Sequence, residues 1–234
     1  MKFTWMKWSV LPVAVLLAGS VAMAQQQSSQ QSQGGSSPAP APAATPAPAA
    51  APTPADKPKP TVAERKENQQ DRIAQGVKSG QLTAGETSKL ETKEAAINGE
   101  TKADRAANGG KLTAAEKKQI NGQQNQVSKQ IYADKHNANT QHNGNSKVGQ
   151  RQENQQDRIA QGIKSGQMTA GEAAKAENQQ KGINQQVKAD RAANGGKLTT
   201  GEKKQVNKEQ NAASKNIYNK KHNAKTQPDA KPKE

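Results

Sequence analysis

Single aliphatic residues recur at helical spacing within long polar runs from residue 62 onward, and no stretch alternates in the way a strand would. Ile73 and Val77, for example, lie one helical turn apart. Alanine, glutamate, lysine and glutamine fill most remaining positions and favour helices. The pattern predicts an all-α fold, whose first three helices cover residues 62–79, 84–108 and 114–136.

A short corner separates the expected helices and occurs four times, around Thr83, Thr113, Thr169 and Thr199. Each copy reads Gly, one residue, Leu or Met, Thr, two residues, Glu. The glycine suits the left-handed conformation that closes a preceding helix. The threonine and the glutamate three residues later form a capping box, which begins a helix. Each corner therefore predicts a tight turn between two antiparallel helices.

The chain from residue 65 onward is duplicated: residues 65–76 return as 151–162, and the register continues without a gap to 135–138 against 221–224. Roughly two-thirds of the aligned positions are identical, which indicates a tandem repeat of one three-helix unit. We therefore expect a signal peptide over 1–24, a disordered Gln/Ser and then Ala/Pro-rich arm over 25–61, helical repeats over 62–146 and 147–226, and a disordered tail over 227–234.

The first 24 residues have the layout of a secretory signal peptide. Lys2 and Lys7 precede an apolar run over 10–21, and Ala22-Met23-Ala24 is a small-x-small cleavage site. A membrane-spanning helix is the alternative, but it needs about twenty predominantly apolar residues. The chain has no cysteine, which excludes both a lipid anchor on cysteine and disulfides. We expect export to the periplasm or the cell exterior, with no transmembrane segment after cleavage.

The chain is strongly basic, with a formal net charge of +15, and removing Lys2 and Lys7 lowers this by two, to +13. Aliphatic residues are sparse, so we expect a thin core near the boundary of disorder. The second repeat is the more basic one. A cationic helix of this kind adheres to anionic cell-envelope polymers or lipid headgroups, or else serves only to keep the protein soluble. The candidate contacts are Lys203, Lys204, Lys208, Lys215, Lys220, Lys221 and Lys225.

Sequence-specific nucleic-acid binding is not expected, because such binding favours exposed aromatic rings and arginine. Tyr132 and Tyr218 each follow an isoleucine and are expected in the core. Protein partners are not indicated by any motif.

The corners also resemble the second half of an EF-hand calcium loop, with glycine at position six, an apolar residue at eight and glutamate at twelve. The first half departs from that pattern: Gln75, Val77 and Ser79 occupy its ligand positions in the first loop, and Arg105 comes first in the second. A helix stop followed by a capping box explains the same residues without an ion. A calcium-responsive module is kept as the alternative function, and its ligands would be Glu86, Glu116, Glu172 and Glu202.

No set of residues for catalysis or for a cofactor is apparent, so we expect neither an enzyme nor a metal centre. The three histidines have no cysteine or closed ligand set around them, and His136 and His222 are expected at helix ends on the surface. Glu91 and Glu94 form a carboxylate pair, but the second repeat has Gln180 in place of Glu94. That loss indicates a solvated helix face.

The run Gln-Gln-Asp-Arg-Ile-Ala-Gln-Gly-x-Lys-Ser-Gly-Gln-(Leu/Met)-Thr-Ala-Gly-Glu, with the later Ser-Lys-x-Ile-Tyr-x-x-Lys-His-Asn, resembles a group of small exported bacterial helical-repeat proteins of unknown function. The resemblance covers residues 62–226 and implies a helical exported module, without implying any catalytic or binding residue. The sequence thus predicts a non-catalytic exported protein with a structural or interaction role at the cell envelope.

Overall fold

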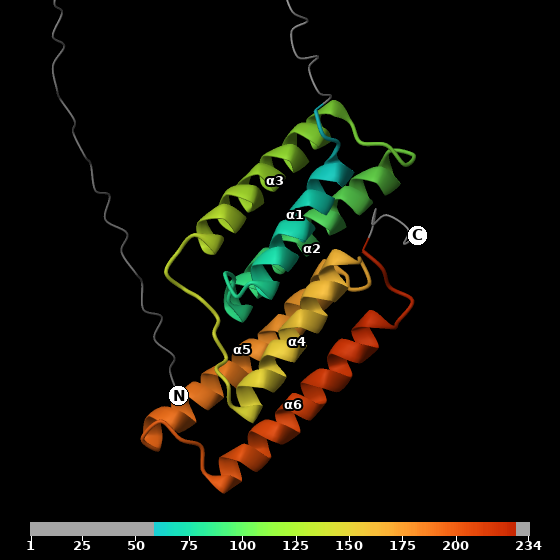
Figure 1. Ribbon diagram of the computed structural model, residues 1–234. Helices are drawn as coiled ribbons and strands as arrows, with labels where there is room; N and C mark the ends of the chain where they lie inside the picture. The colour runs from blue at the N-terminus through green and yellow to red at the C-terminus, as the bar shows by residue number, and fades with distance from the viewer. Residues whose placement is uncertain (1–58, 228–234) are drawn as a thin grey trace, which may run out of the picture. The chain divides into compact units, whose positions relative to one another are not determined.

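Six α-helices and no strand make up the part of the chain that the structure describes, residues 59–227 of a computed structural model (Figure 1). The predicted all-α fold class is therefore confirmed. The expected signal peptide, the expected arm up to residue 58 and the expected tail from residue 228 lie outside the described residues. The helices are α1 (Val62–Lys78), α2 (Ala84–Ala107), α3 (Ala114–Lys135), α4 (Lys147–Lys164), α5 (Ala170–Ala193) and α6 (Thr200–Lys221).

The four corners contain the predicted capping boxes. At the first, the Thr83 side chain accepts the N–H of Glu86 at 3.3 Å, and the Glu86 carboxylate accepts the N–H of Thr83 at 2.9 Å. The same reciprocal pair begins α3, α5 and α6. The glycine three residues before each threonine has a positive φ, with 70° at Gly80. A further box, which we did not predict, joins Thr61 to Glu64 at the start of α1.

In the corner after α1 and in the corner after α4, a second glycine lets the corner pack tightly against the helix before it. Leu82 is buried, and its N–H donates to the carbonyl of Gly76 at 3.0 Å. A Cβ on Gly76 would lie 2.6 Å from Leu82 Cδ1, which is closer than two carbon atoms approach. Gly162 has the same relation to Met168 in the second repeat. Glycine is therefore required here for close approach.

The segment after the third helix of each repeat is hydrogen-bonded to the first corner of the same repeat. Gln141 donates its N–H to the carbonyl of Gly80 at 2.8 Å, and its Oε1 accepts the N–H of Ala84 at 2.7 Å. Gln227 makes the same two bonds at the corner of the second repeat, both at 2.8 Å. Gln227 is also buried. Gln227, the first residue of the expected tail, thus belongs to this corner, because its amide oxygen satisfies the start of α5.

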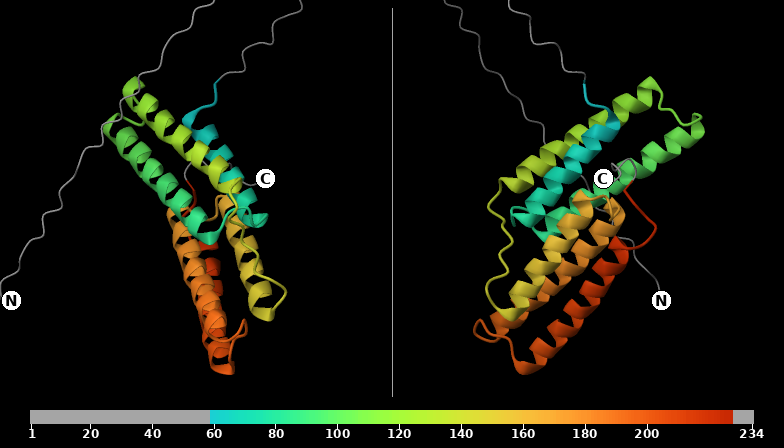
Figure 2. Two further views of the ribbon diagram at one scale, coloured as in Figure 1. Left: turned by 90° about the vertical axis from the view of Figure 1, so that its left-hand side faces the viewer. Right: turned by 45° about the vertical axis from the view of Figure 1, so that its right-hand side comes forward.

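The two repeats pack against each other through equivalent helices, α2 against α5 and α1 against α4 (Figures 1 and 2). Ser88 Oγ donates to the carbonyl of Ala174, its own equivalent 86 residues later. Gly85 lies against Lys181. Their equivalents in the other repeat, Gly171 and Ala95, are also in contact. Residue numbers rise on α2 as their contacts fall on α5, so these helices are antiparallel and an approximate two-fold axis relates the repeats.

One apolar core runs through both repeats, and buried glutamines supplement it. Gln69 donates to the carbonyl of Gln124 at 2.6 Å, and Gln124 in turn donates to the carbonyl of Val62 at 2.9 Å. The second repeat has the same chain of bonds. These amides tie the third helix to the first, where the sequence supplies few aliphatic residues. The main core consists of Ile73, Ala74, Val77, Leu82, Leu90, Ile97, Ile120, Val127, Ile131, Ile159, Ala160, Ile163, Met168, Ala173, Ala176 and Ile217.

Candidate functional site

Helix α6 turns its lysines away from the core. Val206 and Ile217 are buried on its inner side. Lys204, Lys208 and Lys215 are exposed, and their spacing of four and seven residues places them on one face. At 100° per residue this face lies opposite the buried one. The outer side of α6 is therefore a line of ammonium groups.

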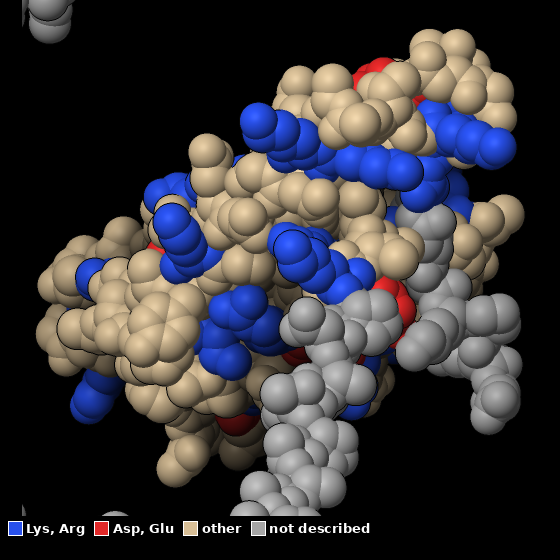
Figure 3. Space-filling view, turned by 90° about the horizontal axis from the view of Figure 1, so that it is seen from above, with Lys and Arg blue, Asp and Glu red and all other residues tan. Residues whose placement is uncertain are grey.

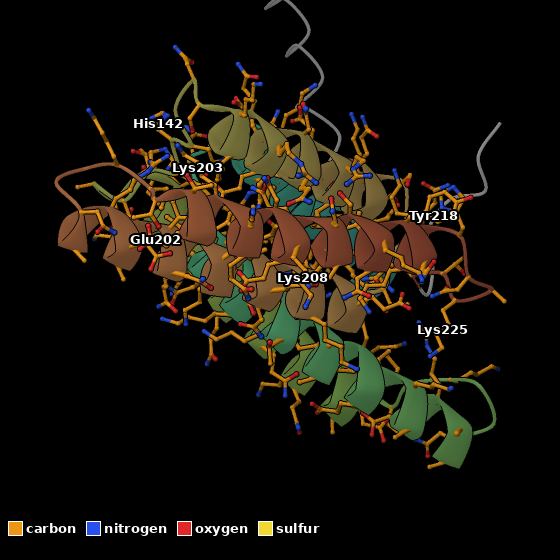
Figure 4. The ribbon with its side chains drawn as sticks, turned by 90° about the horizontal axis from the view of Figure 1, so that it is seen from below. His142, Glu202, Lys203, Lys208, Tyr218 and Lys225 are labelled. Carbon is orange, nitrogen blue, oxygen red and sulfur yellow. The ribbon has the colours of Figure 1, made fainter. Side chains whose placement is uncertain are left out.

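The seven predicted contact lysines do not converge on one point. Figure 4 shows the labelled ones following α6 and the segment beyond its end. Lys220 and Lys221 are half-buried, and the Nζ of Lys221 donates to Gln161 at 3.5 Å. The structure thus arranges these lysines as an extended cationic strip along α6 and the segment after it. Its fully exposed members are Lys203, Lys204, Lys208, Lys215 and Lys225.

A cation-lined cavity of about 550 Å³ lies between the start of α2, the connector between the repeats and one side of α5. Lys181, Lys188 and Arg191 line it, and none of its lining residues is Asp or Glu. Arg191 donates to Ser146 Oγ at 3.2 Å. We did not predict this cavity. The seven- and ten-residue spacing of the three cations is visible in the sequence, but the elements that face them are not.

Among the charged side chains on the face seen in Figure 3, lysine and arginine form several broad patches, whereas acidic side chains show only in small ones. No described helix is long and apolar enough to cross a membrane.

The four glutamates of the calcium alternative lie in four separate corners, and each is engaged as a helix cap. Oε2 of Glu86 accepts from the N–H and the hydroxyl of Thr83, and Oε1 accepts from Asn137 at 2.8 Å and Asn139 at 3.1 Å. Burial acts to raise the pKa of Glu86, but these hydrogen bonds lower it below its ordinary value. Both oxygens are thus already occupied in the folded protein.

Glu91 and Glu94 are fully buried, so the expectation of a solvated helix face for this pair is wrong. The equivalent of Glu91 in the second repeat, Glu177, is also fully buried. Gln70 donates to Glu91 at 3.2 Å, and the matching glutamine of α4 donates to Glu177 at 2.9 Å. We misjudged these residues because the sequence did not reveal that α2 has a second repeat packed against it.

The surroundings of these carboxyl groups favour their neutral form. Burial raises the pKa of Glu91 well above its usual range, and the neighbouring Glu94 and Glu177 raise it further, while the bond from Gln70 opposes the shift. Burial raises the pKa of Glu177 to about 8. Burial also raises the pKa of Glu94 to about 7, against the opposing effect of the Lys66 ammonium. A proton on each group avoids placing several negative charges in the interior.

Differences between the repeats are matched inside the fold. The buried Lys66 and Glu94 of the first repeat correspond to the buried Gln152 and Gln180 of the second, so both charges are lost together. A second exchange reverses a polar pair between the second and third helices: Gln123 donates to Glu100 in the first repeat at 2.7 Å, whereas Gln186 donates to Glu209 in the second. Such matched changes indicate packing requirements.

The two tyrosines of the described chain are exposed by 62% and 58%, so their expected place in the core is wrong. Tyr132 stacks on His136 with ring centroids 4.1 Å apart, and Tyr218 stacks on His222 in the same way. Both histidines cap the C-terminal ends of their helices on the surface, as predicted. The ring pairs form because positions four residues apart share one helix face.

No group of three or more metal-ligating side chains comes together within residues 59–227. No protein-family model, curated protein or solved structure matches this chain significantly. Function must therefore be argued from the residues and their arrangement.

Proposed function

We propose that this chain is a non-catalytic exported helical-repeat protein that adheres to anionic polymers of the cell envelope through the outer side of α6. One observation carries the proposal: Lys204, Lys208 and Lys215 form an exposed line directly opposite the buried side of the helix. The export signal read from the N-terminal sequence and the resemblance to small exported bacterial helical proteins support the envelope as the place of action.

The spacing of this line suits a polymer better than a compact ligand. A rise of 1.5 Å per residue separates successive ammonium groups by roughly 6 and 10 Å along the helix. Each exposed ion pair contributes at most about 1 kcal/mol, so useful affinity requires several contacts at once. Because these contacts are solvated, moderate salt should release the polymer.

A lipid surface is the less favoured partner. A helix that lies on a membrane buries an apolar face among the lipids. The apolar side of α6, with Val206 and Ile217, is turned into the protein core instead. What remains for the partner is charge and hydrogen bonding, which anionic polymers supply along their whole length.

The second repeat is better suited than the first. Lys208 and Lys225 of the second repeat correspond to Gly122 and Asn139 of the first, and Lys220 corresponds to Asp134. The outer line of α3 therefore has a gap where α6 has a lysine. The chain itself supplies a less cationic version of the same helix for comparison.

Retention of the protein on immobilised alginate, measured against salt concentration, tests the proposal. We expect moderate salt to release the parent protein and a lower salt concentration to release a variant of α6. A control variant that loses the same number of exposed lysines on α2 should be released at the same salt concentration as the parent. The variants are K204Q/K208Q/K215Q and K89Q/K93Q/K102Q. Equal loss in both variants, or no retention at low salt, would overturn the proposal. Stronger binding to phosphatidylglycerol vesicles than to alginate would overturn the choice of a polymer.

A further inference from the structure

The interface between the two repeats encloses acidic groups in a place where nearly all other contacts are apolar or neutral. Glu91 and Glu94 come from α2 and Glu177 comes from α5, and all three have no exposed surface. These two helices form the most extensive contact between the repeats. Glu177 acts on the pKa of Glu91, so these two carboxyl groups approach each other across this contact, whereas Glu94 lies close to Lys66 of α1 in its own repeat.

The polar surroundings of these groups fit the neutral acids better than the ions. Neither oxygen of Glu94 has a hydrogen-bond partner, and Oε1 of Glu91 and Oε1 of Glu177 are also without one. An ionised carboxylate in such a place would need several donors or a close cation. The charged groups that act on the cluster are Lys66 of α1 and the glutamates themselves; Gln70 of α1 and Gln156 of α4 each donate one neutral hydrogen bond to it.

One buried lysine cannot balance three carboxylates. Lys66 lowers the pKa of Glu94, whereas burial is the main influence on the pKa values of Glu91 and Glu177. Once these two groups lose their protons, two negative charges on facing helices repel each other in a medium of low polarity. The strain is relieved when α2 and α5 move apart and water reaches both groups. Each three-helix unit keeps its own capped corners and internal glutamine ties, and the test below follows helix content to distinguish separation from unfolding.

We propose that the contact between α2 and α5 is a proton-controlled latch: protonated Glu91 and Glu177 keep the two repeats closed, and loss of their protons lets the repeats separate. The device goes beyond adhesion to polymers, and it does not depend on α6. An exported protein is exposed to the pH of its surroundings. The external pH would therefore determine whether the surfaces of α2 and α5 are buried or accessible.

The direction of the pH effect follows from the raised pKa values. A buried acid whose pKa is higher in the folded than in the unfolded chain contributes its full stability below about pH 4.5 and loses it as pH rises through the folded value. For Glu94 and Glu177 the folded values are about 7 and about 8. The closed state should therefore weaken progressively up to about pH 8.

Thiol labelling at position 88 tests the latch in the full chain, which has no cysteine of its own. Ser88 lies at the interface with 4% of its surface exposed, whereas Ala212 on α6 is exposed. The ratio of labelling rates in S88C and A212C corrects for thiol ionisation. We expect this ratio to rise at least about tenfold between pH 6 and pH 8.5 while circular dichroism shows the helices intact.

Replacing the three glutamates by glutamine supplies the matched control, because glutamine already stands at one of the equivalent positions as Gln180. In E91Q/E94Q/E177Q the labelling ratio should stay low at both pH values. E177Q alone, with a smaller response than the parent, serves the same purpose if the triple variant does not fold. A ratio that does not change with pH, an increase that survives in the glutamine variants, or a loss of helix together with labelling would overturn the latch. None of these outcomes bears on retention by alginate.

Discussion

Glu91 and Glu177 occupy equivalent positions in the two repeats, and both bury their carboxyl groups at the contact between α2 and α5. Each accepts a hydrogen bond from a glutamine 21 residues earlier, on the first helix of its own repeat. The approximate two-fold axis brings the two acids near each other, so that each copy of the sequence supplies one acid of this pair. The duplication has thus produced an interior feature that one repeat alone does not contain.

Lys66 and Glu94 should behave as a coupled pair. Lys66→Gln alone removes the cation that favours the ionised Glu94, and we expect it to destabilise the protein by about 1 to 3 kcal/mol at pH 8. K66Q/E94Q reproduces the neutral pair of the second repeat, Gln152 and Gln180, and should recover most of that loss. Urea denaturation of the parent, both single variants and the double variant measures the coupling. Strictly additive changes would contradict it.

Two glycine substitutions should have opposite signs. Gly80→Ala places a Cβ on a residue with φ of 70° and 2.8 Å from the carbonyl oxygen of Gln141, so we expect a loss of about 1 to 2 kcal/mol. Gly99 lies inside α2 with no atom within 4 Å of its Cβ position, so Gly99→Ala should add about 0.5 to 1 kcal/mol. The melting temperatures of the two variants, compared with that of the parent protein, test both expectations. A drop in both variants would show that the corner is not special.

Calcium should leave the protein unchanged. Both carboxylate oxygens of Glu86 are occupied by Thr83, Asn137 and Asn139, and the corner offers no set of acids at the other ligand positions. We expect no saturable heat on titration with calcium and no change in helix content with a chelator. Saturable binding at micromolar calcium would restore the alternative of a metal-responsive module.

Lys181 should add to the binding of anionic saccharides at the cation-lined cavity. Its equivalent in the first repeat is Ala95, so Lys181→Ala introduces a residue that the fold already accepts. We expect a several-fold weaker affinity for alginate oligomers, because a contact between charged groups contributes about 1 to 2 kcal/mol when partly shielded. Calorimetry of this variant and the parent checks the prediction, and an unchanged affinity would exclude the cavity as a binding region.

Helix positions and corners were predictable from the sequence because they depend on local chemistry. A glycine with positive φ, a threonine cap and a glutamate three residues later act within one turn, and each corner formed as expected. Tyr132 was expected in the core because it follows Ile131. Adjacent residues on a helix point in different directions, so the buried Ile131 leaves Tyr132 on the surface.

The interior and the cavity could not be predicted in the same way, because they depend on how the two copies meet. Nothing in the local pattern around Glu91 differs from that of an exposed acid on a polar helix. The exchange of Lys66 and Glu94 for two glutamines was a usable signal, since both changes occur at matched positions, but it becomes meaningful only when the helices are known to touch. The cation-lined cavity likewise needs α5, the connector and the start of α2 together.

The antiparallel packing of α2 on α5 underlies the approach of the buried Glu91 and Glu177. Ser88 and Ala174 lie on the axis of this contact, with Ser88 Oγ bonded to the carbonyl of Ala174 at 3.2 Å. In the chain without other cysteines, S88C/A174C should form an intramolecular disulfide under mild oxidation at pH 6. S88C/A212C should not. Mass spectrometry of monomeric protein with the 88–174 crosslink is the predicted result; only intermolecular dimers, or equal crosslinking in the control, would contradict the packing of the two repeats.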